Sequence, residues 1–345
     1  MNLKELAQKL GLSPTTVSRA LNGYPEVSES TRARVTAAAK RHNYRPNARA
    51  IRLATGRAMA IGHVIPTASR HEIMNPVFAD FIAGAGETYA RNGYDLILTI
   101  VPDDDEDRIY RDLHARGAVD GIIVHGPRLN DPRLRLLDDI GFPYVVHGRA
   151  TGTVTPYSWL DVNNRRAFRR ATEFLLDLGH RRIGLINGLE FMDFAIRRRT
   201  GYLEALAARG IAPDPDLMSS EEMTELRGYR AACAMLGHDR PPTAFLASSM
   251  IPGLGLRRAI EERGLRLGTD ISVIIHDDAL SYLPNGDDVP IFTATRSSVR
   301  EAGRQAAEML LDIIAHPACA PQQRLLEAEL IIGQSTGPVP APRRS

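Results

Sequence analysis

Four polar side chains between residues 13 and 23 are spaced so that one face of a helix would carry all of them. Within SPTTVSRALNG, Thr15, Ser18, Arg19 and Asn22 lie at relative positions i, i+3, i+4 and i+7, which share one side of an α-helix. Hydroxyl, guanidinium and amide groups are the side chains that bond phosphates and base edges in the major groove of DNA. The pattern therefore indicates a DNA-reading helix, and the alternative is a polar face that meets only water.

Small apolar residues on the opposite face predict how this helix packs. Val17, Ala20 and Leu21 fall together there, and their size would let the helix lie close against a neighbour. Ser13 suits the N-cap, and Pro14 suits the first helical position, where a missing N–H costs nothing.

Helices are also predicted on both sides of this one. The first begins at the N-cap Asn2 and ends at Gly11, and the third runs from about Ser28 toward Tyr44 before Pro46 interrupts it. Two helices joined by a turn of about three residues, with a third packed on them, form a helix-turn-helix unit.

The charge of the chain is divided unevenly along its length. Residues 1–57 hold 11 lysines and arginines against three acids, a net charge of +8, although the whole chain carries only +2. The remaining residues therefore carry a net charge of −6. A basic head on an acidic body suggests a polyanionic partner for the head, and a merely solvated basic face is the alternative.

The N-terminal segment resembles the DNA-binding headpiece and hinge of the LacI/GalR family of transcription regulators. The matching elements are LKELAQKLG, TTVSRALNG, VSESTRARV and NYRPNARAIRL. The resemblance implies that Pro14 and Thr15 take the two base-reading positions, and Pro14 could read only by shape or by contact with a thymine methyl group. It also implies supporting contacts to phosphates or further bases from Thr16, Ser18, Arg19 and Asn22.

Residues 47–53, NARAIRL, match the hinge helix of that family. The resemblance implies a segment that orders on operator DNA, where the paired hinges of a dimer enter the minor groove. Leu53 falls at the position of a leucine wedge that opens a base step, although a leucine taken alone is more often a core residue. The hinge residues expected to contact DNA are Asn47, Ala50 and Leu53.

From residue 58 onward, apolar runs alternate with amphipathic segments. Strands are predicted near 58–66, 94–101, 120–126 and 143–148, and in a second series near 181–188, 243–249, 271–277 and 292–297. Helices are predicted near 76–92, 105–116 and 131–140, and then near 164–178, 195–209, 223–237, 252–263 and 299–315. Buried strands alternating with helices predict parallel sheets, and two such series predict two lobes with a ligand crevice at the carboxyl ends of the strands.

The expected fold class is therefore a small all-α helix-turn-helix domain followed by a two-lobed α/β domain with parallel sheets. The second domain resembles the type I periplasmic-binding-protein fold, which is the effector domain of the same family. The predicted division is a headpiece at 1–46, a hinge at 47–57, an effector-binding and dimerisation domain at 58–337 and a flexible tail at 338–345.

Several strand ends carry side chains that suit a ligand cleft. By the resemblance, Arg198 in RRRTGY takes the place of an arginine that grips sugar hydroxyls, and Asp277 in IIHDD takes that of an aspartate that accepts from them. A guanidinium fork suits vicinal hydroxyls because it donates two parallel hydrogen bonds. Weaker candidates are Phe78, Ser248 and Arg149. Arg198 could instead belong to a solvated arginine run, and Asp277 could instead cap a turn.

The motifs of common enzymes and metal sites do not occur in the sequence. HExxH, GxSxG, GxxxxGK[ST] and CxxC are all absent, and the ten histidines show no metal-ligand spacing. The only two cysteines, Cys233 and Cys319, suit a reducing cytoplasm. The start of the chain has no signal-peptide pattern, and no apolar run is long enough for a membrane helix. We therefore expect no catalysis, no cofactor, no metal and no membrane contact.

Taken together, these patterns predict a cytoplasmic, ligand-responsive regulator, most simply a repressor of carbohydrate genes that a sugar releases from its operator. The resemblance implies a homodimer on a pseudo-palindromic operator. A second hypothesis keeps the DNA-binding role but makes the effector a nucleobase or a phosphorylated metabolite, or makes it a co-repressor. A third hypothesis is a stand-alone sugar-binding protein, which a signal peptide would have supported. A fourth is a sugar-processing enzyme, which the lack of catalytic motifs disfavours.

Overall fold

Three short helices form the N-terminal head. The computed structural model describes residues 1–21, 23–44, 56–66, 75–101 and 105–340. The head helices are α1 (Leu3–Leu10), α2 (Pro14–Leu21) and α3 (Glu29–Arg41). The N-cap of α1 is a capping box, in which Asn2 accepts from Glu5 N (3.0 Å) and Glu5 accepts from Asn2 N (3.1 Å).

The head has its own small core. Leu6, Val17 and Val35, one from each helix, are all 0% exposed. Ala20 is also buried, and Leu21 packs against the same cluster. The prediction that the apolar face of α2 docks on its neighbours is therefore confirmed.

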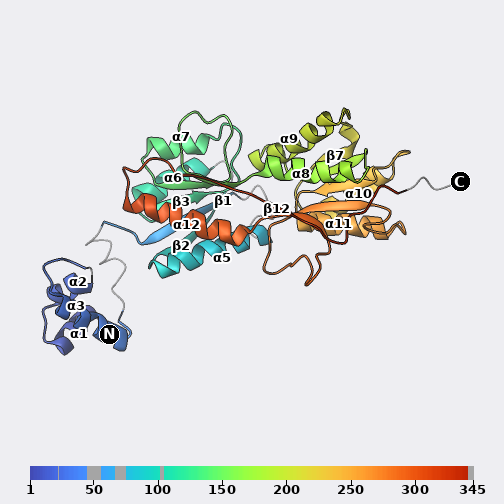
Figure 1. The fold of residues 1–345 in the computed structure, drawn as a ribbon. Helices are drawn as coiled ribbons and strands as arrows, with labels where there is room; N and C mark the ends of the chain where they lie inside the picture. Colours follow the sequence, from blue (N-terminus) through green and yellow to red (C-terminus); the bar gives the residue numbers. More distant parts are fainter. Residues whose placement is uncertain (22, 45–55, 67–74, 102–104, 341–345) are drawn as a thin grey trace.

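Two parallel-dominated sheets of six strands form the body (Figure 1). The first has the order β11-β5-β4-β3-β1-β2 and the second β12-β10-β9-β8-β6-β7. The strands of the first are β1 (Ala60–Pro66), β2 (Asp95–Val101), β3 (Gly121–Val124), β4 (Tyr144–His147), β5 (Trp159–Val162) and β11 (Gln323–Leu326). Those of the second are β6 (Ile183–Asn187), β7 (Met218–Ser220), β8 (Ala244–Ala247), β9 (Ser272–Asp277), β10 (Thr293–Arg296) and β12 (Glu329–Ile331). Among these strands, only β12 is antiparallel to its neighbour.

Helices cover both faces of each sheet. Around the first sheet lie α5 (Pro76–Arg91), α6 (Glu106–Ala115), α7 (Pro132–Asp139) and α12 (Val299–Ala315), and around the second lie α8 (Asn164–Asp177), α9 (Asp193–Ala208), α10 (Glu225–Leu236) and α11 (Met250–Glu261). Consecutive residues of β3 show why two layers are needed: Ile122 belongs to the core cluster on one face and Ile123 to the cluster on the other. Such doubly buried strands produce the apolar runs that predicted a parallel sheet.

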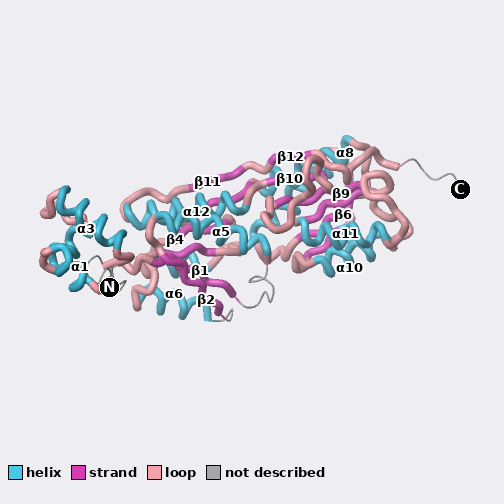
Figure 2. Tube along the Cα trace, turned by 90° about the horizontal axis from the view of Figure 1, so that it is seen from below, coloured by secondary structure: helices cyan, strands magenta, loops and turns pink. Residues whose placement is uncertain are grey.

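The chain passes between the lobes three times, after β5, β10 and β11. Figure 2 shows β11 and β12 following one another along the edges of the two sheets. The sequence predicted eight strands and missed β5, β7, β11 and β12, which have three or four residues each. It also placed the helix near 299–315 in the second series, whereas α12 packs against α5 in the first lobe.

The C-terminal segment contacts the second lobe at Ser335 and Val339. Ser335 is fully buried, and its hydroxyl donates to Val273 O (2.5 Å). Val339 N donates to Leu178 O (3.0 Å). Most of the predicted tail, residues 341–345, lies outside the described residues, so the boundary at 338 stays a prediction. In the part of the chain that the structure describes, no helix combines the length and apolar character needed to cross a bilayer.

Candidate functional site

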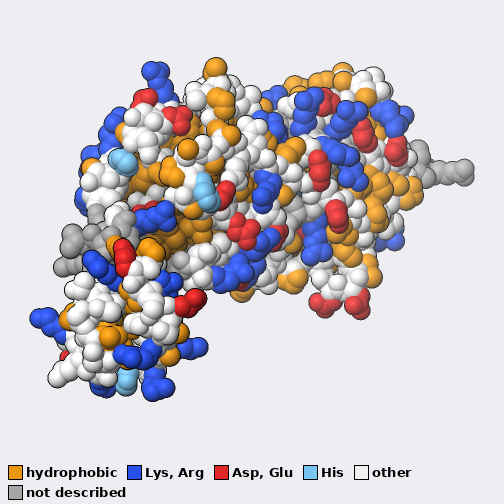
Figure 3. Space-filling view, turned by 60° about the vertical axis from the view of Figure 1, so that its left-hand side comes forward, with side chains coloured by type: hydrophobic (Ala, Val, Ile, Leu, Met, Phe, Trp, Pro, Cys, Tyr) orange, Lys and Arg blue, Asp and Glu red, His pale blue; other side chains and the backbone are white. Residues whose placement is uncertain are grey.

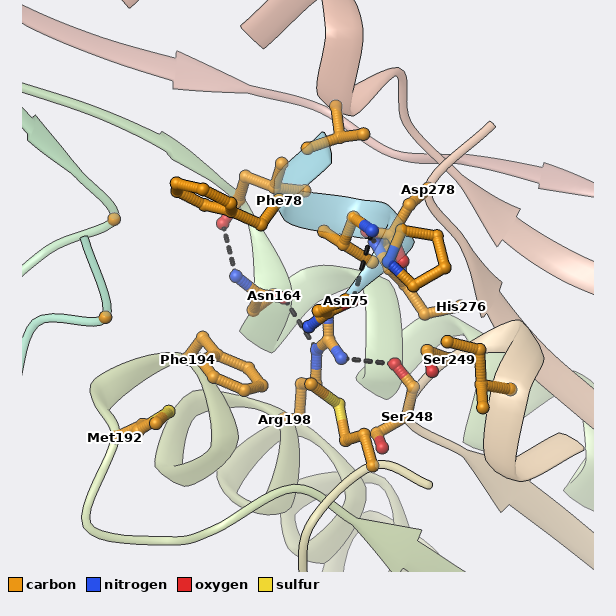
Figure 4. A pocket seen from close by; sticks show the side chains of 18 of the residues that line it. Asn75, Phe78, Asn164, Met192, Phe194, Arg198, Ser248, Ser249, His276 and Asp278 are labelled. Carbon is orange, nitrogen blue, oxygen red and sulfur yellow. Dashed lines mark hydrogen bonds and ion pairs between the residues drawn. The ribbon is translucent and has the colours of Figure 1, made fainter. Parts of the chain in front are cut away.

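A cavity of about 570 Å³ lies between the two lobes at the carboxyl ends of their strands. It is within the size range of small-molecule sites. From the first lobe, α5 and the ends of β3, β4 and β5 contribute Phe78, His125, His147 and Asp161. From the second lobe come Arg198, Ser248, His276 and Asp278 (Figure 4).

Arg198 is the central polar group of the second-lobe wall. It lies on α9, is only 6% exposed, and its Nε donates to Asn164 Oδ1 (2.7 Å) while Nη1 donates to Ser248 O (Figure 4). Its guanidinium carbon is 5.1 and 5.0 Å from the ring centres of Phe168 and Phe194. Burial lowers the pKa of Arg198 to about 10, although Asp278 and Asp161 oppose this. The group therefore remains charged at neutral pH and is fixed in place by two acceptors and two rings.

Asp278 provides a carboxylate on the same wall. Burial opposes its ionisation, but His276 and Arg198 together hold the pKa of Asp278 below its ordinary value. The pKa of His276 is also lowered, by burial and by Arg198. His276 Nε2 lies 3.5 Å from Asp278 Oδ1, and Nδ1 lies 3.0 Å from Thr295 Oγ1. At neutral pH the pair is therefore a neutral imidazole beside an ionised carboxylate.

Three imidazoles gather on the first-lobe side. His63 Nδ1 lies 2.9 Å from His125 Nε2, and the rings of His125 and His147 are 5.6 Å apart. The His147 ring stacks on Phe81 with 4.2 Å between ring centres. Burial lowers the pKa of all three histidines, to about 3 for His63 and about 4 for His147. Within the described residues, no cluster of three or more His, Cys, Asp or Glu could hold a metal ion.

The structure brings together three of the five residues predicted for the cleft: Phe78, Arg198 and Ser248 line the cavity. Arg149 lies behind the wall, where its Nε donates to Asp161 Oδ2 (2.7 Å) and its guanidinium covers the Trp159 ring.

Asp277 is not on the lining, because side chains alternate along a strand and its neighbours His276 and Asp278 face the cavity instead. Its carboxylate accepts from Ala279 N (2.8 Å), so Asp277 caps the turn that follows β9.

Sequence reasoning missed most of the polar lining. His125, His147 and Asp278 each follow or end an apolar run, in IIVHG, YVVHG and IIHDD. A polar group at the same place after several predicted parallel strands was the available signal, since these ends meet at one edge of a sheet. Asn164 gave no comparable signal, because its contact with Arg198 joins residues from two different helices.

The lobes also touch directly beside the cavity. Asp193, at the start of α9, donates its backbone N–H to Pro127 O (3.0 Å), and its Oδ1 accepts from Thr151 N (3.1 Å). A second contact joins α5 to the segment after β9, where the carboxylate of Asp80 accepts from Ser281 N (2.7 Å) and Ser281 Oγ (2.5 Å). Contacts between the lobes thus stabilise the arrangement in which the cavity is seen.

The outer face of α2 is the second candidate site. Pro14, Thr15 and Arg19 are exposed, and Thr16 and Ser18 are half-buried. The backbone of Thr16 completes the N-cap formed by Ser13, because Thr16 N donates to Ser13 Oγ (3.0 Å). The predicted residues Asn22, Asn47, Ala50 and Leu53 lie outside the described residues.

Basic side chains surround this face. Figure 3 shows lysines and arginines distributed over the surface of the head. Two of the head arginines stabilise its fold, since Arg34 donates to Leu10 O (2.9 Å) at the end of α1 and Arg32 donates to Tyr24 O (2.9 Å). Lys40 and Arg19 are exposed. The head therefore combines a positive surface with an exposed polar helix face, as a major-groove reader requires.

Known proteins resemble the chain over nearly its whole length. Residues 2–47 match the family model described as bacterial regulatory proteins, lacI family, and residues 172–336 match a periplasmic binding protein-like domain. The HTH-type transcriptional regulator AglR of Rhizobium meliloti (strain 1021) is 46% identical over 99% of this chain and 95% of its own length.

Solved structures agree with this match. A transcriptional regulator CelR–cellobiose complex has a TM-score of 0.72 at 29% identity, covering 97% of this chain and 99% of that one. A lac repressor dimer bound to operator and the anti-inducer ONPF has a TM-score of 0.79 at 25% identity, covering 98% of this chain and 99% of that one.

Proposed function

Because this chain belongs to the LacI family of bacterial regulatory proteins, we propose that it represses genes of carbohydrate uptake or catabolism and is released from its operator by a sugar effector. DNA binding and transcription regulation are the functions of the family to which it belongs. The direction of the response and the nature of the effector are the parts that we propose. A cytoplasmic location follows from the same role.

The observation that carries the effector proposal is the presence of Arg198 and Asp278 together on the second-lobe wall of the cavity. They lie close enough to shift each other's pKa, and both are ionised at neutral pH. A buried cation can donate to sugar hydroxyls and a buried carboxylate can accept from them, so a polyhydroxylated ligand would satisfy both. The apolar rings of Phe78 and Phe194 on the same lining would cover the less polar faces of a sugar.

Charge argues against a phosphorylated effector. Arg198 is the only lysine or arginine among the described residues of the lining, and Asp278 already faces it. The histidines there are neutral because burial lowers their pKa values. A phosphate would therefore enter a site without surplus positive charge, which costs desolvation energy that nothing offsets. A nucleobase remains the second candidate, since Phe78 and Phe194 offer rings on which a base could stack.

For the DNA-binding half, we propose that residues 1–46 form the headpiece, 47–57 the hinge and the remainder the effector-binding body. Pro14 and Thr15 would take the two base-reading positions in the major groove. Thr16, Ser18, Arg19 and Asn22 would support them with phosphate or further base contacts. Asn47, Ala50 and Leu53 would act in the minor groove.

We also propose a homodimer on a pseudo-palindromic operator. Leu98 and Ile100, at 42% and 50% exposure on the edge strand β2, provide an apolar surface that a second copy would cover.

Two measurements test the proposal. A thermal-shift screen of neutral sugars, sugar phosphates and nucleobases should give stabilisation by at least one neutral sugar, because a ligand raises stability by RT ln(1 + [L]/Kd). Selection of bound duplexes from a random pool by the full chain should return a pseudo-palindrome. The same sugar should then release that duplex, and tighter DNA binding with the sugar would contradict repression relieved by an inducer.

Variants of the full chain test the reading face. Thr15→Ala and Arg19→Ala should weaken binding to the selected duplex by about 1–3 kcal/mol while leaving random duplexes less affected. Lys40→Ala is the matched control, since an exposed basic residue outside α2 should lower both affinities equally. Equal losses for Arg19→Ala on both duplexes would reduce Arg19 to a phosphate contact.

A further inference from the structure

A buried chain of hydrogen bonds ends at the cavity wall of the first lobe. The hydroxyl of Tyr89, on α5, lies 3.1 Å from Nε2 of His63, on β1. Nδ1 of His63 lies 2.9 Å from Nε2 of His125, which follows β3. Tyr89 is 1% exposed and His63 is 0% exposed, whereas His125 lines the cavity. Three elements of the lobe thus meet in one line of polar atoms.

The positions of the protons in this chain follow from counting donors. The lowered pKa values of His63 and His125 leave each with one ring proton at neutral pH. Among the described residues, His63 Nε2 is the only hydrogen-bond partner of the Tyr89 hydroxyl. A buried O–H without an acceptor costs about 1–3 kcal/mol, so Tyr89 donates to Nε2 of His63. His63 must then carry its proton on Nδ1 and donate to Nε2 of His125.

His125 consequently carries its proton on Nδ1. In the described part of the chain this nitrogen has no hydrogen-bond partner, and it is also not among the buried atoms that lack one. It is therefore accessible, and the accessible space beside His125 is the cavity.

We propose that His125 is a specificity-determining residue that presents a fixed N–H donor to an oxygen atom of an uncharged ligand. Tyr89 and His63 are its positioning residues. This inference rests on the proposed effector site and adds a donor on the first-lobe wall, opposite the second-lobe wall that carries Arg198 and Asp278. In solvent, a neutral imidazole can carry its proton on either ring nitrogen. The buried chain of hydrogen bonds restricts His125 to the tautomer protonated on Nδ1. An oxygen placed there is favoured only as an acceptor.

The proton position is tested first, because it requires no ligand. A long-range ¹H–¹⁵N correlation spectrum of the full chain at pH 7, assigned by comparison with His125→Asn, should show His125 protonated on Nδ1 and bare on Nε2. Tyr89→Phe removes the group that sets the direction of the chain, so the opposite tautomer of His125 should become populated. Protonation of His125 on Nε2 in the unsubstituted chain would overturn the inference.

The ligand role is tested by calorimetric titration with cellobiose, maltose and sucrose as uncharged disaccharide probes. For a probe that binds, His125→Leu should weaken affinity at least tenfold, because it deletes the donor. His125→Asn keeps an amide N–H near the position of Nδ1 and should stay within about threefold of the unsubstituted chain. A purely structural role would predict similar losses for both variants, in proportion to their melting temperatures.

The outcomes separate this inference from the proposed function. Failure of all probes to bind the unsubstituted chain would contradict a disaccharide effector, whatever the spectrum shows. If a probe binds His125→Leu as tightly as the unsubstituted chain, the role of His125 is refuted. The proposed sugar site is not contradicted by that result.

Discussion

Lowering the pH from 7 to 5 should destabilise the first lobe, because His63 is buried where it cannot accept a proton at pH 5. Burial and the neighbouring His147 lower its pKa to about 3, against an ordinary value of 6.5. In the unfolded chain His63 takes up a proton below pH 6.5, whereas in the folded chain it does so only near pH 3. Its contribution to stability is therefore complete above pH 6.5 and is lost as the pH falls toward 3. Between pH 7 and 5 the loss is about 2 kcal/mol.

Other imidazoles of the lobe act in the same direction. Burial lowers the pKa of His147 to about 4 and that of His125 well below its ordinary value. The total loss should therefore exceed that of His63 alone. Typical proteins have only about 5–15 kcal/mol of unfolding free energy, so this loss is a large share of it.

Urea unfolding, monitored by tryptophan fluorescence, measures the pH dependence of the unfolding free energy of the first lobe. Trp159 is the only tryptophan of the chain, and it packs on the first-lobe core from β5. His63→Gln removes one titrating group, so the difference in unfolding free energy between pH 7 and 5 should shrink by about 2 kcal/mol. Ile122→Val, fully buried in the same lobe, is the control. It should cost about 0.5–1.5 kcal/mol at both pH values and leave their difference unchanged.

An unchanged pH difference in His63→Gln would refute this reasoning. It would mean that His63 is protonated in the folded state above pH 5, and the proton count that assigns Nδ1–H to His125 would lose its premise. A smaller difference in Ile122→Val would instead show that the pH effect follows general stability rather than titration of the imidazoles.

Further predictions concern packing, the effector and assembly. Gly303→Ala should destabilise the chain by about 1–3 kcal/mol, because its Cβ would lie 2.1 Å from a backbone oxygen of α5. Gly86→Ala, with nothing within 4 Å, should stabilise it by roughly 0.5–1 kcal/mol, and urea unfolding measures both. Arg198→Met should abolish sugar-induced thermal stabilisation while leaving operator affinity intact in a mobility-shift assay, so a variant that is still released by the sugar would contradict its role. Ile100→Lys should shift the chain from dimer to monomer in sedimentation velocity, whereas an unchanged dimer would place the interface elsewhere.

The sequence predicted the helices and strands whose hydrophobic residues follow a regular spacing. The eight predicted body helices and eight predicted strands all exist, because apolar runs and amphipathic segments record local burial. The missed strands β11 and β12 depend on partners far along the chain, since β11 pairs with β5 and β12 with β10. Residues 323–326 are largely exposed, so no buried pattern marks them. The packing of α12 on the first lobe also depends on tertiary contacts, and no local sequence pattern predicts it.

Site residues could be predicted from the sequence only where a local motif marks them. Arg198 was found from its motif, but the asparagine that orients it comes from another helix. The choice between Asp277 and Asp278 was a matter of strand register, and a shift of one residue exchanges the two faces of a strand. The histidines of the first-lobe wall were not predicted, because in the sequence alone a histidine cannot be distinguished from any other neutral polar residue. Only the meeting of β1, β3 and α5 shows that His63 and Tyr89 fix the proton of His125.

Helix α12 gives the cavity a direct physical connection to the segment that leads to the head. Its first turn lines the cavity through Val299 and Ala302, and near its other end, about 25 Å away for 17 residues, Ile314 O accepts from Arg57 Nη2 (3.3 Å). Arg57 is the last residue of the proposed hinge segment 47–57 and directly precedes the body. The close approach of α12 to α5 at Gly303 leaves the two helices little freedom to slide independently. A ligand that displaces Val299 therefore acts on a stiff element whose far end contacts Arg57. For this reason Gly303→Ala should alter the response of DNA binding to sugar as well as stability, whereas Gly86→Ala should alter stability alone.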